Sequence, residues 1–537
     1  MIPFSFTQAF LVACWAFALP VQAVPAPVVD LGYARYQGMF VADKVTNATH
    51  TEFLGVRYAA PPTGARRFRA PAPPEATPGV QLAGSQALTC LQAGQGNSPD
   101  SPFRPGQHKR AADLGASEDC LFLNVYVPGS ITQKKSLPVI FWIHGGGYVA
   151  GSTSGLDGND LIRESGEGVI IVLAQYRLGL FGFLPGQKVK EGGDLNAGLL
   201  DQQFSLRWIQ EHISKFGGDP DKVTIWGQSA GAGSVLQHVV ANGGMTKPPL
   251  FRAAITSSTF LPSQYAYNDR IPELLYSEAV NQVNCSSATD TLECLREAEA
   301  DVLEAVNTNI NQSGFFGTFV FVPVVDGTLI TDRPTQVLRR GRLNGKISYS
   351  VTNPMEGADF VNQSITSTVQ VADYVSQLFP NLQPPDIDGA TRLYAGLGSN
   401  ISQVIAIMGE SIFICPTYYL LRGFGGNAFK GEFALPPGNH AQDVPYYFSN
   451  GLPPPFADPD FDNAFADSFA DFAISLNTNI RHNSSIITPT WPLWMGTNEM
   501  VFNMTESGSP IIKVMKTSNT LLRRCEFWES VSAATGQ

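Results

Sequence analysis

The sequence predicts an α/β fold in which a large, mostly parallel central sheet is flanked by helices and carries helical cap insertions. Three observations predict it. Several short, apolar, β-rich runs are typical of strands that are covered on both faces. One such run is followed by a segment with helical spacing and then by another strand, which is the order of a right-handed crossover. That last strand leads into a Gly-x-Ser-x-Gly turn and a run of small residues suited to a helix.

The N-terminus has the pattern of a secretory signal peptide. An apolar run at residues 10–19 precedes Val21-Gln22-Ala23, a small-residue cleavage signal, although no Lys or Arg stands before the run. We therefore expect residues 1–23 to be removed and the mature chain to be secreted. No later stretch is long and apolar enough to span a bilayer, so a soluble protein is expected. Residues 24–537 contain no repeat or linker and are predicted to form a single domain.

Cysteine usage agrees with export. Of 7 cysteines, Cys14 leaves with the signal peptide and an even number remains, which in a secreted chain favours disulfides. Local pairing would join the first two and the next two, leaving the last two for each other. None forms a Cys-x-x-Cys pair, so metal ligation is the weaker alternative. The remaining cysteines are Cys90, Cys120, Cys285, Cys294, Cys415 and Cys525.

The surface is expected to be acidic and glycosylated. A net charge of −11 disfavours nucleic acid and anionic membranes as partners. The histidines are scattered, and no metal or other cofactor is expected. N-x-Ser/Thr sequons fit a glycosylated surface, although such sequons also arise by chance. They begin at Asn47, Asn284, Asn311, Asn362, Asn400, Asn483 and Asn503.

The sequence predicts a series of strands, one crossover helix and two longer helical segments. Apolar side chains at Phe204, Trp208 and Ile213 have the spacing of a helix. Two long segments, 268–317 and 366–421, look mainly helical and lie between sheet elements, which predicts cap or lid insertions rather than separate domains. The strands are expected at residues 51–58, 120–127, 138–143, 168–173, 222–226 and 346–352, and the crossover helix at 201–216.

The Gly-x-Ser-x-Gly turn places Ser229 between the strand at 222–226 and a helix. Gly227 and Gly231 let strand and helix pass closely, which pushes the hydroxyl out of the sheet surface, the arrangement of a nucleophile elbow. The N–H of Ala230 would face developing negative charge from the first turn of the helix. The alternative is an ordinary capping serine in a glycine-rich turn.

Three glycines follow the strand at 138–143, within His144-Gly145-Gly146-Gly147-Tyr148. Glycines cost conformational entropy, so they indicate a backbone that must come close to a ligand. Such a loop is a second source of N–H groups for an oxyanion. A plain glycine-rich turn is the alternative.

A carboxylate and a histidine complete the candidate set. Glu356 lies just past the strand at 346–352, at the edge where open α/β sheets place their chemistry, although most glutamates are solvated surface residues. His440 stands in a Pro/Gly-rich loop, where a lone histidine is more often structural or exposed. The chain order Ser, Glu, His matches the order expected for this arrangement.

Together these motifs resemble the type B carboxylesterase/lipase family of α/β-hydrolases, which includes fungal lipases and esterases and the cholinesterases. The resemblance covers most of the mature chain. Its specific segments are residues 61–71 (PPTGARRFRAP), 117–128 (SEDCLFLNVYVP), 144–148 (HGGGY), 175–184 (QYRLGLFGFL), 198–220 (GLLDQQFSLRWIQEHISKFGGDP) and 224–231 (TIWGQSAG), with weaker matches around Glu356, His440, Cys415 and Cys525.

The resemblance implies roles for particular residues. Ser229 would be the nucleophile, His440 the general base and Glu356 its orienting acid. Gly146, Gly147 and Ala230 would form the oxyanion hole. The resemblance also implies the three local disulfide pairs, an ion pair of Arg67 with Glu118, and a hydrogen bond from Ser258 to the catalytic acid.

Two departures from the family pattern matter. Gln228 stands where Glu is common, so we expect altered local hydrogen bonding with retained catalysis. The loop between Cys90 and Cys120 contains no Trp, whereas cholinesterases use one there to hold a quaternary ammonium. A choline ester specialist is therefore not expected.

The expected function is hydrolysis of small-molecule carboxylic esters through a Ser-His-Glu triad and an acyl-enzyme. Lipases of the family carry an amphipathic lid in the first disulfide loop. In this chain the only bulky apolar side chains of residues 91–119 are Leu91, Phe103 and Leu114, and prolines between them prevent a long helix with an apolar face. This favours soluble or modest-sized esters, with aromatic, feruloyl-type esters as one class. The alternatives are a lipase or sterol esterase covered by residues 314–322, and a non-catalytic, cholinesterase-like binding protein.

Overall fold

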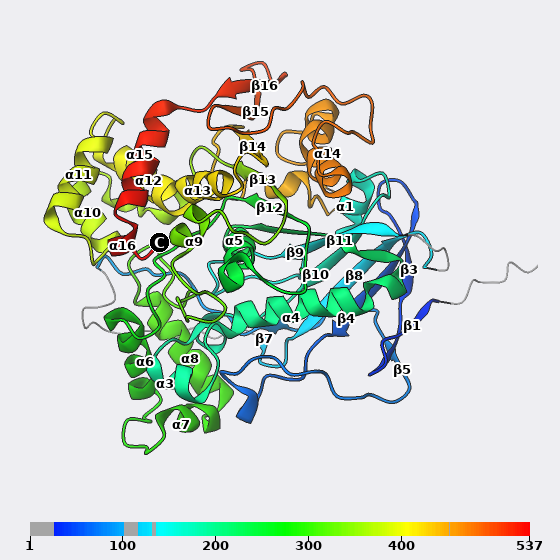
Figure 1. Ribbon diagram of the computed structural model, residues 1–537, viewed down its shortest axis with the longest axis horizontal. Coiled ribbons are helices and arrows are strands. Elements are labelled where there is room, and N and C mark those ends of the chain that lie inside the picture. The colour runs from blue at the N-terminus through cyan, green and yellow to red at the C-terminus, as the bar shows by residue number, and fades with distance from the viewer. Residues whose placement is uncertain (1–25, 101–115, 132–135, 451) are drawn as a thin grey trace, which may run out of the picture.

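The computed structural model describes residues 26–100, 116–131, 136–450 and 452–537. The predicted signal peptide, Cys14 and the loop residues Phe103 and Leu114 lie outside the described residues. Most of the described chain is arranged around one large mixed sheet with helices on both faces (Figure 1).

The sheet has 11 strands in the order β16-β15-β14-β13-β12-β11-β9-β10-β8-β4-β3. All strands from β15 to β10 in this order are parallel, and the strands at both ends are antiparallel. The parallel centre agrees with the crossover predicted from the sequence. The strands are β3 (Met39–Ala42), β4 (Thr49–Arg57), β8 (Phe122–Pro128), β9 (Leu137–Ile143), β10 (Ile170–Ala174), β11 (Gly218–Gln228), β12 (Ala253–Ser257), β13 (Ile347–Thr352), β14 (Ala428–Phe433), β15 (Asn498–Met504) and β16 (Pro510–Lys516).

The N-terminal part of the described chain also forms two smaller sheets. One contains three strands and the other two. The first consists of β1 (Val28–Asp30), β2 (Arg35–Gln37) and β5 (Val80–Leu82), and the second of β6 (Thr89–Cys90) and β7 (Ala116–Ser117).

The core is split between the two faces of the large sheet because alternate strand residues point to opposite sides. In β9, Phe141 belongs to one core cluster and Trp142 to the other. Helices α4 (Ala197–His212) and α5 (Ala230–Gly244) pack on the first side, and α1 (Gly158–Glu164) and α14 (Pro459–Ser475) on the second (Figure 1). On the second side Trp226 of β11 stacks on Phe469 of α14 at 4.4 Å between ring centroids and meets Trp142 edge-on at 5.0 Å.

The two segments predicted to be helical insertions are helical. The first lies between β12 and β13 and the second between β13 and β14. The first contains α6 (Arg270–Gln282), α7 (Thr291–Glu297) and α8 (Ala300–Gln312), followed by α9 (Pro334–Arg339). The second contains α10 (Val371–Leu378), α11 (Pro384–Tyr394), α12 (Asn400–Gly409), a π-helical turn η5 (Glu410–Ile414) and α13 (Cys415–Gly423).

The remaining helices are short or follow the last strand. They are α2 (Gly179–Phe183), α3 (Gln187–Gly192), α15 (Asn519–Ser530) and α16 (Ser532–Thr535), with 3₁₀ turns η1 (Gly64–Arg66), η2 (Ile213–Phe216), η3 (Ala358–Phe360), η4 (Gln363–Ile365) and η6 (Val444–Tyr446). One continuous helical stretch, Asn400–Gly423, has the length and apolar character of a membrane span, but 89% of its most apolar window is buried. The expectation that no later stretch is long and apolar enough to span a bilayer is therefore wrong on length and composition, and the burial identifies this stretch as a core helix of the fold.

Two predicted elements begin four residues earlier in the structure, whereas the other predicted strand boundaries differ by at most two residues. The crossover helix begins at Ala197 rather than at residue 201, and its last turn, from Ile213, is a 3₁₀ turn. Its first four residues, Ala-Gly-Leu-Leu, show no helical spacing of apolar and polar side chains, so the sequence pattern does not reveal them. Strand β11 begins at Gly218, four residues before the predicted start, because Gly218 already pairs with Leu137 of β9 ahead of a bulge.

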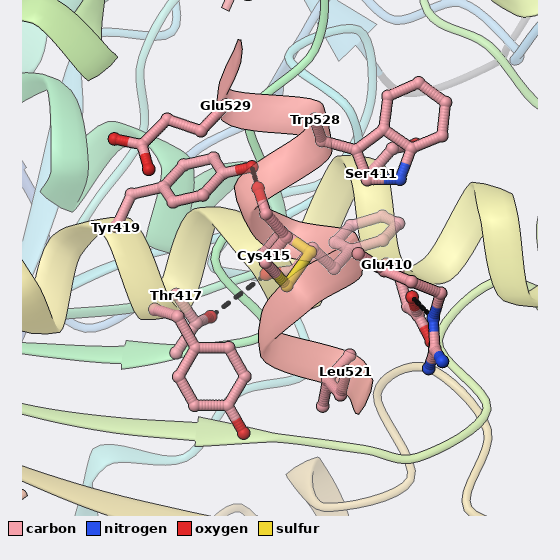
Figure 2. The surroundings of a disulfide bond; sticks show 12 residues. Glu410, Ser411, Cys415, Thr417, Tyr419, Leu521, Trp528 and Glu529 are labelled. Carbon is pink, nitrogen blue, oxygen red and sulfur yellow. Dashed lines mark hydrogen bonds and ion pairs between the residues drawn. A yellow bond between two sulfur atoms is a disulfide. The ribbon is translucent and has the colours of Figure 1, made fainter. Parts of the chain in front are cut away.

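The three disulfides have the predicted pairing, with Cα–Cα distances of 5.0, 5.8 and 5.0 Å in chain order. Figure 2 shows Cys415–Cys525, which joins α13 to α15, with Tyr419 and Glu410 on either side. The Tyr419 hydroxyl donates to the Cys525 carbonyl at 2.8 Å, and Glu410 pairs with Arg524 at 2.6 Å. The predicted ion pair of Arg67 with Glu118 is also present, at 2.6 Å between two nearly buried side chains.

Candidate active site

Ser229 lies at a sharp turn between β11 and α5. Its backbone has φ 57° and ψ −125°, which is strained for a non-glycine residue. The turn needs glycine beside it, because a Cβ on Gly231 would lie 2.0 Å from the Ile143 carbonyl oxygen of the neighbouring strand. Ser229 retains 7% of its surface exposed. A strained serine at a strand-to-helix turn is the geometry that the sequence pattern predicts.

Glu356 and His440 come together because the segments after β13 and β14 run side by side. The Met355 N–H donates to the Gly438 carbonyl at 2.8 Å, and Met355 pairs with Asn439 as a parallel bridge. One residue further along each segment, His440 Nδ1 lies 2.5 Å from Glu356 Oε2. Glu356 is fully buried, so its carboxylate has little freedom to turn away from the imidazole.

Asn353 holds the other oxygen of Glu356. Its backbone N–H donates to Glu356 Oε1 at 2.8 Å. Its side-chain amide donates to Ser258 Oγ and to Asp443 Oδ1, each at 3.2 Å. The direct bond from Ser258 to Glu356 implied by the family resemblance is therefore replaced by a connection through Asn353. The Glu356 carboxylate accepts instead from the Asn353 N–H and contacts His440 Nδ1.

Asp443 is a second buried carboxylate behind Glu356. It is fully buried, and it accepts from the Tyr447 hydroxyl at 3.0 Å as well as from Asn353. Burial, and then the nearby charge of Glu356, raise the pKa of Asp443. Asp443 and Tyr447 follow His440 by three and seven residues, and nothing in that pattern indicates a contact with Asn353.

The His440 ring lies between aromatic side chains and an amide. The rings of Phe413 and Phe360 lie 4.6 and 5.0 Å from it, centroid to centroid. Phe413 is carried by the π-helical turn, in which the Ile412 carbonyl accepts from the Leu261 N–H at 2.9 Å. Gln228 Nε2 lies 3.2 Å from His440 Nε2.

The glycine loop passes directly over Ser229. A Cβ on Gly145 would lie 3.0 Å from the Ser229 Cβ, and one on Gly147 would lie 2.1 Å from the Phe319 ring. Gly146 and Gly147 both have positive φ, at 107° and 64°. Within the described residues neither of their N–H groups has an intramolecular acceptor. These donors and that of Ala230, the first residue of α5, can serve an oxyanion beside Ser229.

His144, the first residue of the glycine loop, supports the loop backbone as an uncharged side chain. It is buried and stacks on Tyr176 with 4.4 Å between ring centroids. Burial lowers the pKa of His144 to about 4. Its Nδ1 lies 2.9 Å from the Gly145 carbonyl oxygen, so the neutral ring can hold the loop backbone without adding charge to the site.

An apolar cavity of about 100 Å³ reaches this loop only through the Phe319 ring, and neither the loop glycines nor the triad residues line it. Phe319, which packs on Gly147, forms one wall, and Phe260, Leu275, Met408 and Ile412 form others. Residues 314–322, the alternative cover considered above, form part of the lining rather than an exposed flap. Phe321 in this segment is fully buried.

The sequons differ in accessibility. Asn47, Asn284 and Asn400 are exposed, and three others are half-buried. Asn311 is fully buried on the inner face of α8, where its amide donates to the Asn307 carbonyl at 2.9 Å. Glycosylation of Asn311 in the folded protein is therefore a wrong prediction, because a sequon is read locally and burial is not. The described residues contain no cluster of three or more potential metal ligands.

Both the sequence and the fold are similar to those of known proteins. A model of the carboxylesterase family matches residues 25–528. The chain is 30% identical over 574 residues to carboxylesterase patB of Aspergillus clavatus, covering 96% of this chain and 98% of that protein. It is 33% identical over 407 residues to secreted lipase 1 of Botryotinia fuckeliana, covering 71% of each. The solved structure of Aspergillus niger EstA is similar with a TM-score of 0.82 at 30% identity, covering 96% of this chain and 99% of that one.

Proposed function

Because this chain belongs to the carboxylesterase family and is an ester-hydrolysing enzyme, we propose that it is a secreted serine esterase with a Ser229-His440-Glu356 triad. The observation that carries the proposal is the 2.5 Å contact of His440 Nδ1 with the buried Glu356 carboxylate, beside the strained Ser229. The triad requires no cofactor.

In the first half-reaction Ser229 Oγ attacks the ester carbonyl carbon while His440 Nε2 removes its proton. The resulting oxyanion accepts hydrogen bonds from the Gly146, Gly147 and Ala230 N–H groups, each worth about 3 kcal/mol in related enzymes. The bond to the alcohol oxygen then breaks, and His440 returns the proton to that oxygen. Glu356 stabilises the intervening imidazolium without taking its proton.

In the second half-reaction a water molecule repeats the attack on the acyl-enzyme. His440 takes one water proton, and the hydroxide oxygen bonds to the carbonyl carbon. When the bond to Ser229 Oγ breaks, the serine recovers its proton from His440 and the carboxylic acid leaves. Each turnover therefore consumes one water and yields one alcohol and one acid.

Two observations support soluble or modest-sized esters as the substrate class. The cavity beside the oxyanion loop is apolar and small, and its Phe319 and Phe260 walls suit an apolar or aromatic group such as a feruloyl moiety. The segment 314–322 packs into the core and offers no amphipathic flap. A lipase is the second candidate, since secreted lipase 1 of Botryotinia fuckeliana is among the relatives.

Covalent labelling tests the proposed nucleophile. We expect a fluorescent organophosphonate to label the wild-type protein at Ser229, and Ser229→Ala to abolish both labelling and ester hydrolysis while the protein keeps its thermal unfolding midpoint. Ser152→Ala, which changes a half-buried serine close to the glycine loop, is the matched control and should stay active. A folded Ser229→Ala protein with near-wild-type turnover would contradict the assignment.

Secretion and glycosylation are part of the same proposal. The secreted fungal lipase among the relatives supports export. We expect the mature protein to begin at Val24 and to carry glycans first at the exposed Asn47, Asn284 and Asn400. Peptide mass spectrometry before and after glycosidase treatment checks both points.

A further inference from the structure

Gln228 immediately precedes the proposed nucleophile, and its side chain reaches the proposed base. Its Nε2 lies 3.2 Å from His440 Nε2, across 212 residues of sequence, and only 7% of the residue is exposed. The other end of the amide faces the glycine loop, since a Cβ on Gly145 would lie 2.9 Å from Gln228 Oε1. The amide thus connects the base with the loop that carries the oxyanion donors.

The direction of this hydrogen bond follows from the chemistry of the two groups. Glu356 occupies Nδ1, so a neutral His440 carries its proton there and presents a single lone pair at Nε2. An amide nitrogen has protons to donate and accepts none. Gln228 therefore donates to the same lone pair that must take the proton of Ser229. In the described part of the chain no hydrogen bond joins Ser229 Oγ to His440.

We infer that Gln228 is a positioning residue for His440. In the free enzyme its amide donates to Nε2, holds the imidazole in the Nδ1-protonated tautomer, and yields its place to Ser229 Oγ when the ester binds. This inference rests on the proposed function of the triad.

The amide also acts on the charge of the site. If Nε2 gained a second proton, the amide would have to turn and present its Oε1, which in the free enzyme faces the glycine loop. A carboxylate in the same place would accept from and stabilise the imidazolium without turning. The choice of Gln over Glu should therefore extend activity toward acidic pH.

Two variants of nearly the same shape separate these effects. Gln228→Glu replaces the donor by a charge, and we expect the acid limb of kcat/KM against pH to move up by about one pH unit. Gln228→Met removes the donor without adding charge, and we expect kcat to fall about 10-fold at the pH optimum with KM within about two-fold of wild type. Gln175→Met removes an amide from another buried site that does not contact the triad, and should change neither quantity.

A spectroscopic readout keeps the test independent of turnover. The low-field NMR resonance of the His440 Nδ1–H proton should change with pH at a value about one unit higher in Gln228→Glu than in wild type. If both Gln228 variants keep the wild-type pH profile, kcat and resonance while wild type reacts with the organophosphonate, the inference is wrong and the triad stands. If wild type itself neither reacts nor turns over, the proposed function is wrong.

Discussion

At the scale of single residues, two carboxylates compete for the role of catalytic acid. Glu356 is buried against His440, whereas Asp359, three residues on, is exposed and accepts only a 3.4 Å bond from Asn439. We expect Glu356→Gln to lower kcat by about 1,000- to 10,000-fold, because the neutral amide cannot stabilise the imidazolium. The kcat of the variant, measured beside its thermal unfolding midpoint, checks this.

Asp359→Asn is the matched control. The change is the same in chemistry, and we expect a kcat within about two-fold of wild type, since an exposed carboxylate gains little from its contacts. A large loss in Asp359→Asn together with a small one in Glu356→Gln would mean that the acid has been assigned to the wrong residue.

The residues that could be predicted from sequence are those that follow strands. Ser229, Glu356 and His440 stand at strand ends or in loops, where glycine patterns and chain order give a local signal. Their structural neighbours gave none. Asn353 contacts Asp443 across 90 residues, and the Gln228 amide contacts His440 across 212, so only the folded sheet brings these polar groups together.

At the scale of elements, the strands were predictable within a few residues because their apolar runs are short and bounded by turns. The π-helical turn Glu410–Ile414 was not. A single π turn inside an α-helix is rare, and here its Ile412 carbonyl accepts from the N–H of Leu261, which is distant in the sequence. The sequence of the turn is simply apolar and helical in character.

This π-helical turn connects the Cys415–Cys525 disulfide to the active site through Phe413. We expect replacement of both cysteines by alanine to lower the free energy of unfolding by about 3 to 5 kcal/mol, because the bond closes a loop with a sequence separation of 110. Activity should fall as well, since Phe413 packs on His440 and precedes Cys415 by two residues. Denaturant unfolding and kcat of the double variant test both effects.

The disulfide Cys285–Cys294 serves as the control. Its sequence separation is only 9, so its loss should cost about 2 kcal/mol less than that of Cys415–Cys525 on loop entropy alone. Its removal should leave kcat unchanged. If both double variants lost the same amount of stability and of activity, the claim that the π-helical turn connects this disulfide to the active site would be contradicted.

Helix α14 carries acidic groups that make stability depend on pH. Burial raises the pKa of Asp462 and of Asp467 to about 7. Hydrogen bonding to Asp471 raises the pKa of His482. In each case the group holds its proton to higher pH in the folded chain than in the unfolded chain. The stability that the group contributes is therefore greatest at low pH and is lost as pH rises. For the two carboxyl groups the loss runs from about pH 4, near their unfolded value, to about 7.

We expect Asp462→Asn to raise the thermal unfolding midpoint at pH 8 relative to that at pH 5, because asparagine needs no proton to stay neutral. The exposed Asp460, in the same first turn of α14, gives the control variant Asp460→Asn. Calorimetric scans at the two pH values decide the matter. An Asp462→Asn protein with the full wild-type pH dependence would contradict the prediction.

At the scale of the whole molecule, the arrangement of the sheet determines where chemistry can occur. Strands β9, β11, β13 and β14 all present their carboxyl ends to one edge, and each proposed triad and oxyanion-hole residue follows one of them. The parallel centre and this edge could be predicted from the crossover pattern. The antiparallel pairing of β8 with β4 and with β10 could not, because it joins strands that are far apart in the sequence.

Substrate preference is also a property of the whole surface. We expect the rate on a short-chain ester to rise smoothly through its solubility limit, and emulsified long-chain triglyceride to be a poor substrate, since the cavity is small and residues 314–322 are packed into the core. Initial rates on both substrates test this. A sharp increase when the oil interface appears would favour the lipase alternative.

The two indole rings of Trp142 and Trp226 lie 5.0 Å apart at 82° on the adjacent strands β9 and β11. Rings so close can couple their electronic transitions, and the sign of the coupling depends on how the two indoles are oriented relative to each other. The central sheet thus carries its own optical reporter. A coupled circular-dichroism band should vanish when β9 and β11 separate, which allows the integrity of the elbow strand to be followed without substrate or label.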